Sequence, residues 1–113
     1  MNDSVHSPTP NDCALPRIRA DFATFADALD YAARSEKGFN FHDMRGELEF
    51  VYPYRVLRED ALAMARRLVA AGIAKDDRVA LIAETGPDFA ALFCACVYTG
   101  AWPVPLPLPT SFG

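Results

Sequence analysis

Few residues of this sequence have the types and the spacing that catalysis requires. His42 could act as a general base, but no nucleophile accompanies it, and a lone histidine beside Asp43 is more often a solvated turn residue. His6 and Cys13 lie in a polar segment near the N-terminus, away from any site that the sequence defines. We therefore assign no catalytic residue.

Metal-binding patterns are equally weak. Cys94 and Cys96 are two positions apart in a predicted helix, so their side chains point roughly 200° apart around its axis and cannot share an ion. We expect both thiols to pack in the core. Asp76 and Asp77 fall in a predicted turn, where adjacent carboxylates usually remain solvated. We assign no metal ligand.

Phosphate-binding signals are nearly absent as well. The sequence has neither Gly-x-x-x-x-Gly-Lys-Ser/Thr nor Gly-x-Gly-x-x-Gly. Residues 84–87 open a predicted helix, whose N-terminus could hold an anion, but Glu84 and Asp88 flank this turn and would repel phosphate. Both lysines, Lys37 and Lys75, fall in predicted turns. We assign no cofactor-binding residue and interpret the turn as a capped helix start.

Composition narrows the classes of function. The chain has 113 residues, 51% hydrophobic and 23% charged, which is typical of one globular domain. Eleven basic and 15 acidic residues give a net charge of −4, which argues against a nucleic acid partner. Three cysteines without Cys-x-x-Cys favour a reducing, cytoplasmic compartment. Prolines interrupt the uncharged stretch 89–113, so we expect no membrane span.

The first half of the chain is predicted to form a helix, a β-hairpin and a second helix. After a flexible polar leader over residues 1–20, a helix over 25–35 begins at a capping box, in which Thr24 precedes Asp27 by three residues. Alternating residues 39–42 and 48–52 predict a hairpin with one buried face, which Pro53 ends. The clearest helix covers residues 54–71. Its apolar stripe consists of Leu57, Ala61, either Met64 or Ala65, and Leu68. Three basic residues, Arg58, Arg66 and Arg67, lie off this stripe.

The second half predicts a parallel β-α-β unit. Residues 78–83 are continuously apolar after Arg78, which is typical of a strand buried on both faces. A helix capped by Thr85 follows to about Tyr98 and ends at Gly100, and residues 102–106 form the next strand. This helix is apolar almost all round, so an isolated unit would leave one side of it in water.

Prolines occupy every other position from 103 to 109. Because alternate residues of a strand direct their N–H groups to the same edge, all four missing donors fall on one edge. We therefore expect this segment to pair with a neighbouring strand on one side only and then to leave the sheet.

The ordered series of these motifs resembles the adenylate-forming (AMP-binding) family. Residues 54–61 are similar to its Tyr-x-x-Leu-x-x-x-Ala opening, residues 76–81 to its Gly-Asp-Arg-Val-Ala strand, and residues 98–106 to its Tyr-Ala-Gly-x-x-Pro-Val-Pro-Leu segment. Residues 41–48 and the alternating prolines look most like fatty acyl-AMP ligase members. Asp76 stands where the family usually has glycine, and Pro53 where it has Ser or Thr.

The resemblance implies an enzyme that activates a fatty acid with ATP and Mg²⁺ to an acyl-adenylate and releases pyrophosphate, with coenzyme A or an acyl carrier protein as acceptor in some members. It implies an α/β fold in which residues 21–113 are an incomplete N-terminal part of the adenylation domain. The remainder of that domain is then the main partner. The family's phosphate loop, nucleotide contacts and catalytic lysine match no position here, so residues 1–113 alone are expected to be an inactive scaffold.

The alternative is a stand-alone, non-catalytic interaction module. It would dock on a partner through the apolar helix and the proline-rich tail. The sequence favours the enzyme part and leaves the acyl chain length and the acceptor open.

Overall fold

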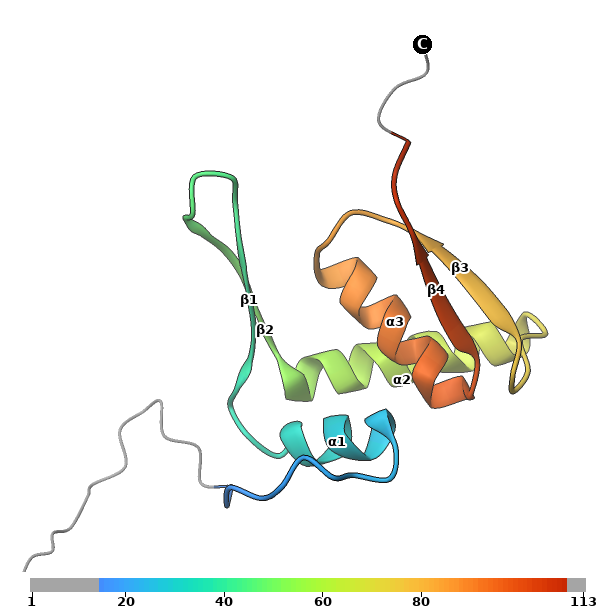
Figure 1. Cartoon of the computed structure of the whole chain (residues 1–113), viewed down its shortest axis with the longest axis horizontal. Coiled ribbons are helices and arrows are strands. Elements are labelled where there is room, and N and C mark those ends of the chain that lie inside the picture. The colour runs from blue at the N-terminus through green and yellow to red at the C-terminus, as the bar shows by residue number, and fades with distance from the viewer. Residues whose placement is uncertain (1–14, 110–113) are drawn as a thin grey trace, which may run out of the picture.

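The computed structural model describes residues 15–109, which form three helices and two separate two-stranded sheets (Figure 1). In chain order the elements are α1 (Phe25–Ala32), β1 (Gly38–His42), β2 (Leu48–Pro53), α2 (Tyr54–Ala70), β3 (Arg78–Ile82), α3 (Pro87–Thr99) and β4 (Trp102–Leu106). The predicted order of helix, hairpin, helix and parallel β-α-β unit is therefore confirmed. The predicted leader falls mostly outside the described residues, as do His6 and Cys13.

Helix α1 begins as the capping pattern indicates. The Asp27 N–H donates to Thr24 Oγ1 at 3.1 Å, which satisfies one of the donors that a helix start leaves unpaired. The helix ends at Ala32 rather than near Ser35, because Ser35 N–H bonds to the Ala32 carbonyl three residues back instead of continuing the α-helical pattern. The Ser35 hydroxyl donates to the same carbonyl at 2.7 Å and closes this end.

The β1–β2 hairpin forms, but the prediction of one buried face is wrong. The strands pair antiparallel, with Phe39 opposite Tyr52 and Phe41 opposite Phe50. Tyr52 at the base is 4% exposed, whereas Phe39 is 42% and Phe50 is 45% exposed. Figure 1 shows the reason: the hairpin projects away from the helices, so Tyr52 is buried in the core cluster while Phe41 packs against that cluster only in part.

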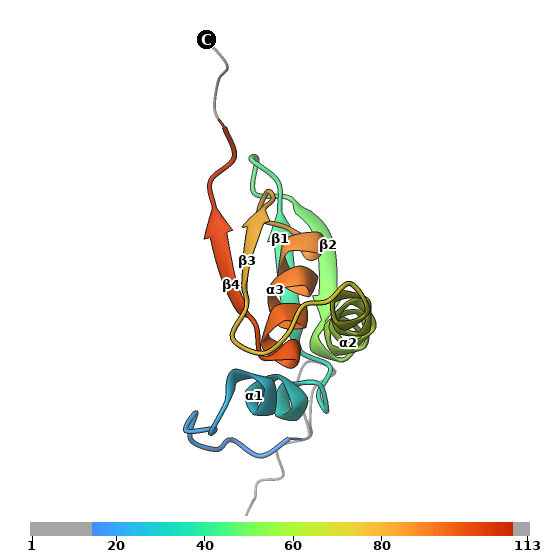
Figure 2. The same cartoon turned by 90° about the vertical axis from the view of Figure 1, so that its right-hand side faces the viewer.

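Helices α2 and α3 pack against each other to form the centre of the molecule. The predicted stripe on α2 is confirmed at Leu57, Ala61 and Ala65, which are buried, and Leu57 and Ala61 share a core cluster with Cys94 of α3. The sequence indicates that α3 needs more cover than an isolated β-α-β unit provides, and the structure supplies it. Helix α2 covers one side of α3, and the β3–β4 sheet packs against the other (Figure 2).

Left-handed glycines follow both long helices, and the predicted end of α3 at Gly100 is confirmed. Gly72 follows α2 with φ 101°, and Gly100 follows α3 with φ 79°. After α2, the Ile73 N–H turns back to the Leu68 carbonyl at 3.0 Å, and both side chains pack under the β3–β4 sheet. Gly100 leads almost directly into β4, whereas residues 73–77 connect Gly72 to β3.

Strands β3 and β4 are parallel and in register, with Arg78 opposite Trp102 and Ile82 opposite Leu106. The expectation that β3 is buried on both faces is wrong. Leu81 packs against α3 and is 5% exposed, whereas Ile82 on the opposite face is 60% exposed. Figure 2 shows α3 on one side of these strands and no helix of the described chain on the other.

The alternating prolines occupy one edge of β4, as the sequence predicts. The Trp102 N–H donates across to the Asp77 carbonyl at 2.7 Å, so the N–H groups of Trp102 and of every second residue after it face β3. Pro103 and Pro105 therefore have their nitrogens on the opposite, unpaired edge. The strand ends at Leu106, where the chain leaves the sheet.

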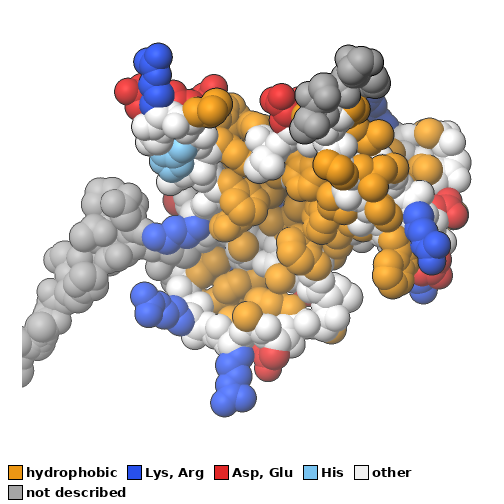
Figure 3. Space-filling view, turned by 45° about the horizontal axis from the view of Figure 1, so that its top comes forward, with side chains coloured by type: hydrophobic (Ala, Val, Ile, Leu, Met, Phe, Trp, Pro, Cys, Tyr) orange, Lys and Arg blue, Asp and Glu red, His pale blue; other side chains and the backbone are white. Residues whose placement is uncertain are grey.

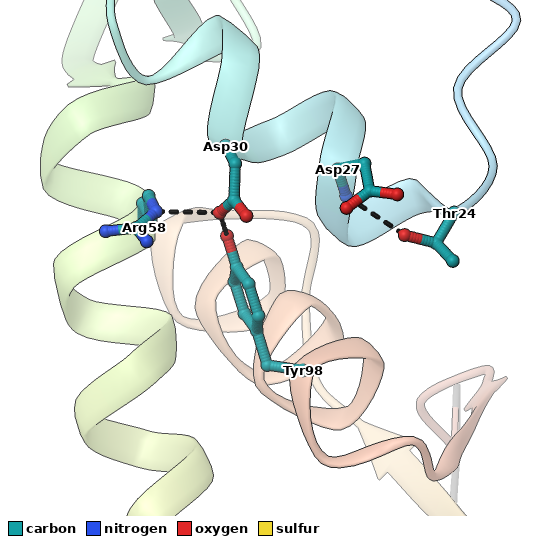
Figure 4. Close-up of polar contacts among 5 residues, drawn as sticks. All are labelled: Thr24, Asp27, Asp30, Arg58 and Tyr98. Atoms are coloured by element: carbon teal, nitrogen blue, oxygen red, sulfur yellow. Dashed lines mark hydrogen bonds and ion pairs between the residues drawn. The ribbon is translucent and has the colours of Figure 1, made fainter.

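One polar cluster joins all three helices (Figure 4). The Tyr98 hydroxyl of α3 donates to Asp30 Oδ1 of α1 at 2.6 Å, and Arg58 Nε of α2 donates to the same oxygen at 2.7 Å. Desolvation tends to raise the pKa of the Asp30 carboxyl, but the hydrogen bonds from Tyr98 and Arg58 and the guanidinium charge outweigh it, so the pKa lies below its usual value. The sequence placed Arg58 off the apolar stripe and did not indicate this cluster.

We predict that Asp30→Ala lowers the free energy of unfolding by about 1 kcal/mol at pH 7, because the Asp30 and Arg58 side chains are 44% and 40% exposed and solvent screens much of their attraction. The carboxyl titrates lower when folded than when unfolded. Its contribution is therefore present above about pH 4 and is lost as the pH falls through the folded value. Urea denaturation at pH 7 and pH 3 measures both effects.

Tyr98→Phe is the matched control, because it removes only one hydrogen bond to the carboxyl. Together with Asp30→Ala it forms a double-mutant cycle, in which a coupling energy should appear at pH 7 and shrink at pH 3. Additive effects of the two substitutions at pH 7 would contradict the assignment of this cluster.

Gly38 is the residue at which the hairpin register is most sensitive. A Cβ atom there would lie 2.1 Å from the Tyr52 carbonyl oxygen and 2.6 Å from Pro53 Cα. Both are backbone atoms, so we predict that Gly38→Ala costs about 1–3 kcal/mol of stability. Gly86→Ala is the control, because nothing lies within 4 Å of a Cβ there, and it should cost under about 1 kcal/mol. Equal losses in thermal unfolding would show that the close approach at Gly38 is not present.

Candidate functional site

A cleft of about 830 Å³ lies between the hairpin and the connection from β3 to α3. The hairpin contributes residues from both strands, and the connection contributes the end of β3 and the start of α3. The lining residues are Asn40, Phe41, His42, Glu49 and Phe50 on the first side and residues 83–88 on the second. Two segments that are more than 30 positions apart in the sequence therefore form one concave surface.

Carboxylates dominate the charge of this cleft. Glu49, Glu84 and Asp88 line it together with His42. Asp88 lies in the first turn of α3, where its negative charge interacts favourably with the helix dipole. The prediction that acidic residues flank this helix start is confirmed, and their charge opposes the binding of phosphate groups.

The predicted cap of α3 is wrong in its identity. The N-cap is Gly86, whose carbonyl accepts the Ala90 N–H at 3.1 Å, and no side chain caps this end. Thr85 stands one position too early, because Pro87 takes the first helical position and supplies no N–H. The Thr85 side chain instead contributes to the wall of the cleft.

His42 lies beside a concave surface, which the sequence did not indicate. It is at the end of β1, and the cleft brings it near the β3–α3 connection. Asp43, its neighbour in sequence, accepts the N–H groups of Arg45 at 2.8 Å and Glu47 at 3.0 Å. Asp43 therefore shapes the hairpin turn rather than orienting an imidazole for base catalysis.

A second, apolar pocket of about 330 Å³ adjoins the cleft, and Phe41 belongs to both. Phe25 of α1 and Phe93 of α3 meet edge to face across it, with ring centroids 6.1 Å apart. Figure 3 shows hydrophobic side chains in a nearly continuous band across this side of the molecule. These phenylalanines come from three separate elements, α1, β1 and α3, and only the fold brings them together.

The two core cysteines behave as predicted. Cys94 and Cys96 are almost fully buried in α3, and burial raises the pKa of the Cys94 thiol to about 11. The thiols therefore remain protonated at neutral pH and act as packing groups. Within residues 15–109, no group of three or more His, Cys, Asp or Glu side chains could hold a metal ion.

The remaining candidate residues, Asp76, Asp77, Arg66 and Arg67, lie in the turn before β3 or on the exposed surface of α2. Asp77 Oδ2 accepts the Ala74 N–H at 2.8 Å and fixes the turn before β3. Asp76 adopts φ 69°, which agrees with the glycine that the resemblance leads one to expect there. Arg66 and Arg67 are exposed on α2, as predicted.

None of the helices described in the chain is long and apolar enough to span a membrane.

Comparisons with known proteins agree with this arrangement. A Caulobacter vibrioides protein named "Putative acyl-CoA synthetase" is 50% identical over 94 residues, which cover 83% of this chain and 16% of that protein. A structure from a study of fatty acyl-adenylate ligases of E. coli and L. pneumophila shares 49% identity at a TM-score of 0.81, over 87% of this chain and 18% of the other. The fatty acid AMP ligase of Legionella pneumophila shares 29% identity at a TM-score of 0.71, over 79% and 16%.

The chain thus spans less than a fifth of the length of these relatives. The family model for AMP-binding enzymes matches residues 44–109, which run from the hairpin turn through both long helices to the proline-rich segment after β4. That match covers more than half of the sequence and includes both strands of the β3–β4 sheet. The chain belongs to the AMP-binding enzyme family.

Proposed function

We propose that this chain is the N-terminal scaffold of an enzyme that activates a fatty acid with ATP to an acyl-adenylate and releases pyrophosphate. The observation that carries the proposal is the match to a fatty acyl-adenylate ligase structure at 49% identity and a TM-score of 0.81. In this proposal residues 21–113 form part of the adenylation domain and residues 1–20 precede it. The Tyr31 hydroxyl of α1 bonds to the Pro16 carbonyl, so the end of this leader lies against the first helix.

The charges of the cleft favour a scaffold rather than a phosphate site. Attack of a carboxylate on the α-phosphorus of ATP needs cations beside the phosphate oxygens, from Mg²⁺ or from Lys and Arg. The cleft instead presents Glu49, Glu84 and Asp88. Lys75 packs beside Gly100, at the opposite end of α3 from the cleft. We infer that the groups that bind ATP and Mg²⁺ belong to other parts of the enzyme.

The scaffold role follows from what this part of the chain holds in place. The α2–α3 core and the Asp30 cluster fix the position of the β3–β4 sheet. That sheet exposes Ile82 and Trp102 on the face away from α3. An apolar face of this kind is stable in water only when it packs against further structure, for which we propose the remainder of the adenylation domain.

The proposed acceptor of the acyl group is coenzyme A or an acyl carrier protein. One similar protein carries the name of an acyl-CoA synthetase, and two similar structures carry the names of acyl-adenylate ligases. Formation of an acyl-CoA thioester by the enzyme that contains this chain would identify the first acceptor, and transfer only to a carrier protein would identify the second.

We predict that the polypeptide in which this chain is joined to the remainder of its domain catalyses fatty acid-dependent ATP–pyrophosphate exchange, and that residues 1–113 alone do not. Ile82→Asp should lower exchange by the joined polypeptide at least about tenfold, because it places a charge in the apolar contact with the rest of the domain. Arg66→Glu is the control, because Arg66 is exposed on α2, and it should leave the rate nearly unchanged.

Two outcomes would contradict the proposal. Exchange by purified residues 1–113 would show that the chain itself holds the nucleotide. Absence of exchange from the joined polypeptide with any fatty acid, while the protein is folded, would show that it does not form acyl-adenylates.

A further inference from the structure

Two hollows lie in line along one face of α2. The first, of about 310 Å³, lies between α2 and α1, and the second, of about 300 Å³, lies between α2 and the end of α3. Helix α2 lines the first with Arg55, Arg58 and Glu59 and the second with Leu62, Ala65, Arg66 and Val69. Because each residue turns an α-helix by about 100°, all of these positions fall within about 120° of its circumference. The two hollows therefore form one groove, which we call the α2 groove.

The Asp30–Arg58–Tyr98 cluster holds the walls of the α2 groove together. Asp30 and Arg58 line the first hollow, and Tyr98 lines the second. The Asp30 carboxylate accepts from Tyr98 at 2.6 Å and from Arg58 at 2.7 Å, so one side chain joins α1 to both α2 and α3 (Figure 4). Contacts among three helices therefore set the spacing of the two hollows.

Arginines give the α2 groove a positive charge, although the whole chain carries a net charge of −4. The Asp30 carboxylate is already bonded to Arg58 and Tyr98. Within residues 15–109, Arg55 forms no ion pair, and Arg34 lies over the Tyr31 ring, 5.5 Å from its centroid. Guanidinium groups beside the first hollow thus remain available to carboxylates of another molecule. The charged residues that line the groove are Arg34, Arg55, Arg58, Arg66, Asp30 and Glu59.

The second hollow is mainly apolar. Val69 is 59% exposed there, Leu62 is half-buried, and Arg66 is exposed on the same face of α2. With a rise of about 1.5 Å per residue, the middle of this hollow lies about 13 Å along α2 from the middle of the first. A molecule that fills both hollows must place an apolar side chain roughly two to three helical turns from a carboxylate.

An amphipathic helix has this shape and spacing. Its side chains at positions i, i+4, i+7 and i+11 lie on one face and extend over roughly 16 Å, and such a face can lie lengthwise in a groove between helices. A lipid surface with anionic headgroups has a suitable charge, but it is too flat to enter two hollows, and Leu62 and Val69 alone offer little apolar surface for insertion. The geometry therefore favours a helix of another protein.

We propose that the α2 groove docks an acidic amphipathic helix of a partner protein. One carboxylate of that helix lies beside Arg34 and Arg55. An apolar side chain contacts Leu62 and Val69, and a second carboxylate lies beside Arg66. The inference goes beyond the proposed function and does not depend on it, because the α2 groove shares no lining residue with the acidic cleft.

A synthetic helical peptide tests the docking. Its alanine- and glutamine-based sequence carries Glu, Leu, Leu and Glu at positions i, i+4, i+7 and i+11, so it presents the same pattern in either orientation. Fluorescence anisotropy of the labelled peptide measures its affinity for the joined polypeptide at about 0.15 M salt. We expect saturable binding that weakens at least about tenfold in Arg55→Glu and in Arg66→Glu, because each substitution brings like charges together. A peptide with one glutamate replaced by lysine should bind Arg55→Glu more tightly than the unaltered peptide does.

Arg67→Glu is the matched control. It makes the same change of charge on the same helix, but Arg67 lines neither hollow, so the affinity should change less than about twofold. Circular dichroism checks that each variant is folded. Equal losses of affinity in Arg55→Glu and Arg67→Glu, or no binding at about 1 mM peptide, would overturn the proposal.

Two further measurements identify other occupants of the α2 groove. Cosedimentation of the joined polypeptide with vesicles of phosphatidylserine and phosphatidylcholine, if it is lost in Arg55→Glu, would assign this face to a lipid surface. Self-association that is lost in Arg55→Glu would assign it to a second copy of the chain. Either result would overturn the proposal. ATP–pyrophosphate exchange should be unchanged in Arg55→Glu, so the docking and the proposed activity can fail independently.

Discussion

The close packing of α2 against α3 is the contact on which the other elements depend. Small residues on both helices, Ala61 on α2 and Cys94 on α3, are buried in one cluster and allow the helix axes to approach closely. Leu57 fills the remaining space at one end and is itself inaccessible to solvent, a burial worth about 1.5–3 kcal/mol. Helix α3 then supports the β3–β4 sheet, and the base of the hairpin reaches the same core through Tyr52.

Periodicity in the sequence was sufficient to predict the elements and their order. The stripe on α2, the glycines after both long helices and the one-sided prolines of β4 each depend on local geometry, so the residues themselves specify them. Burial was harder to predict, because it depends on which elements meet. The apolar pattern of β3 suits two covered faces, but the described chain covers only one, and the aromatic hairpin extends beyond the helices.

In the candidate site too, features that depend on neighbouring residues could be predicted from the sequence, and contacts between distant segments could not. The acidic residues around the start of α3 were recognisable in sequence, and they do line the cleft. Neither the position of His42 on its opposite wall nor the Asp30–Arg58–Tyr98 cluster could be predicted, since each joins segments far apart in the chain. The acidic cleft and the open sheet face are the two features on which the proposed scaffold role of this chain depends.

Trp102 offers the most direct measurement of whether the rest of an enzyme covers this sheet. It is the single tryptophan of the chain, and its side chain is 62% exposed on the face opposite α3. With 5-fluorotryptophan incorporated, its ¹⁹F signal should shift between H₂O and D₂O in residues 1–113. The corresponding signal of the joined polypeptide, assigned by its disappearance in Trp102→Phe, should not shift. An equal shift in both proteins would show that the face stays in water and would contradict the role of this chain as a covered scaffold.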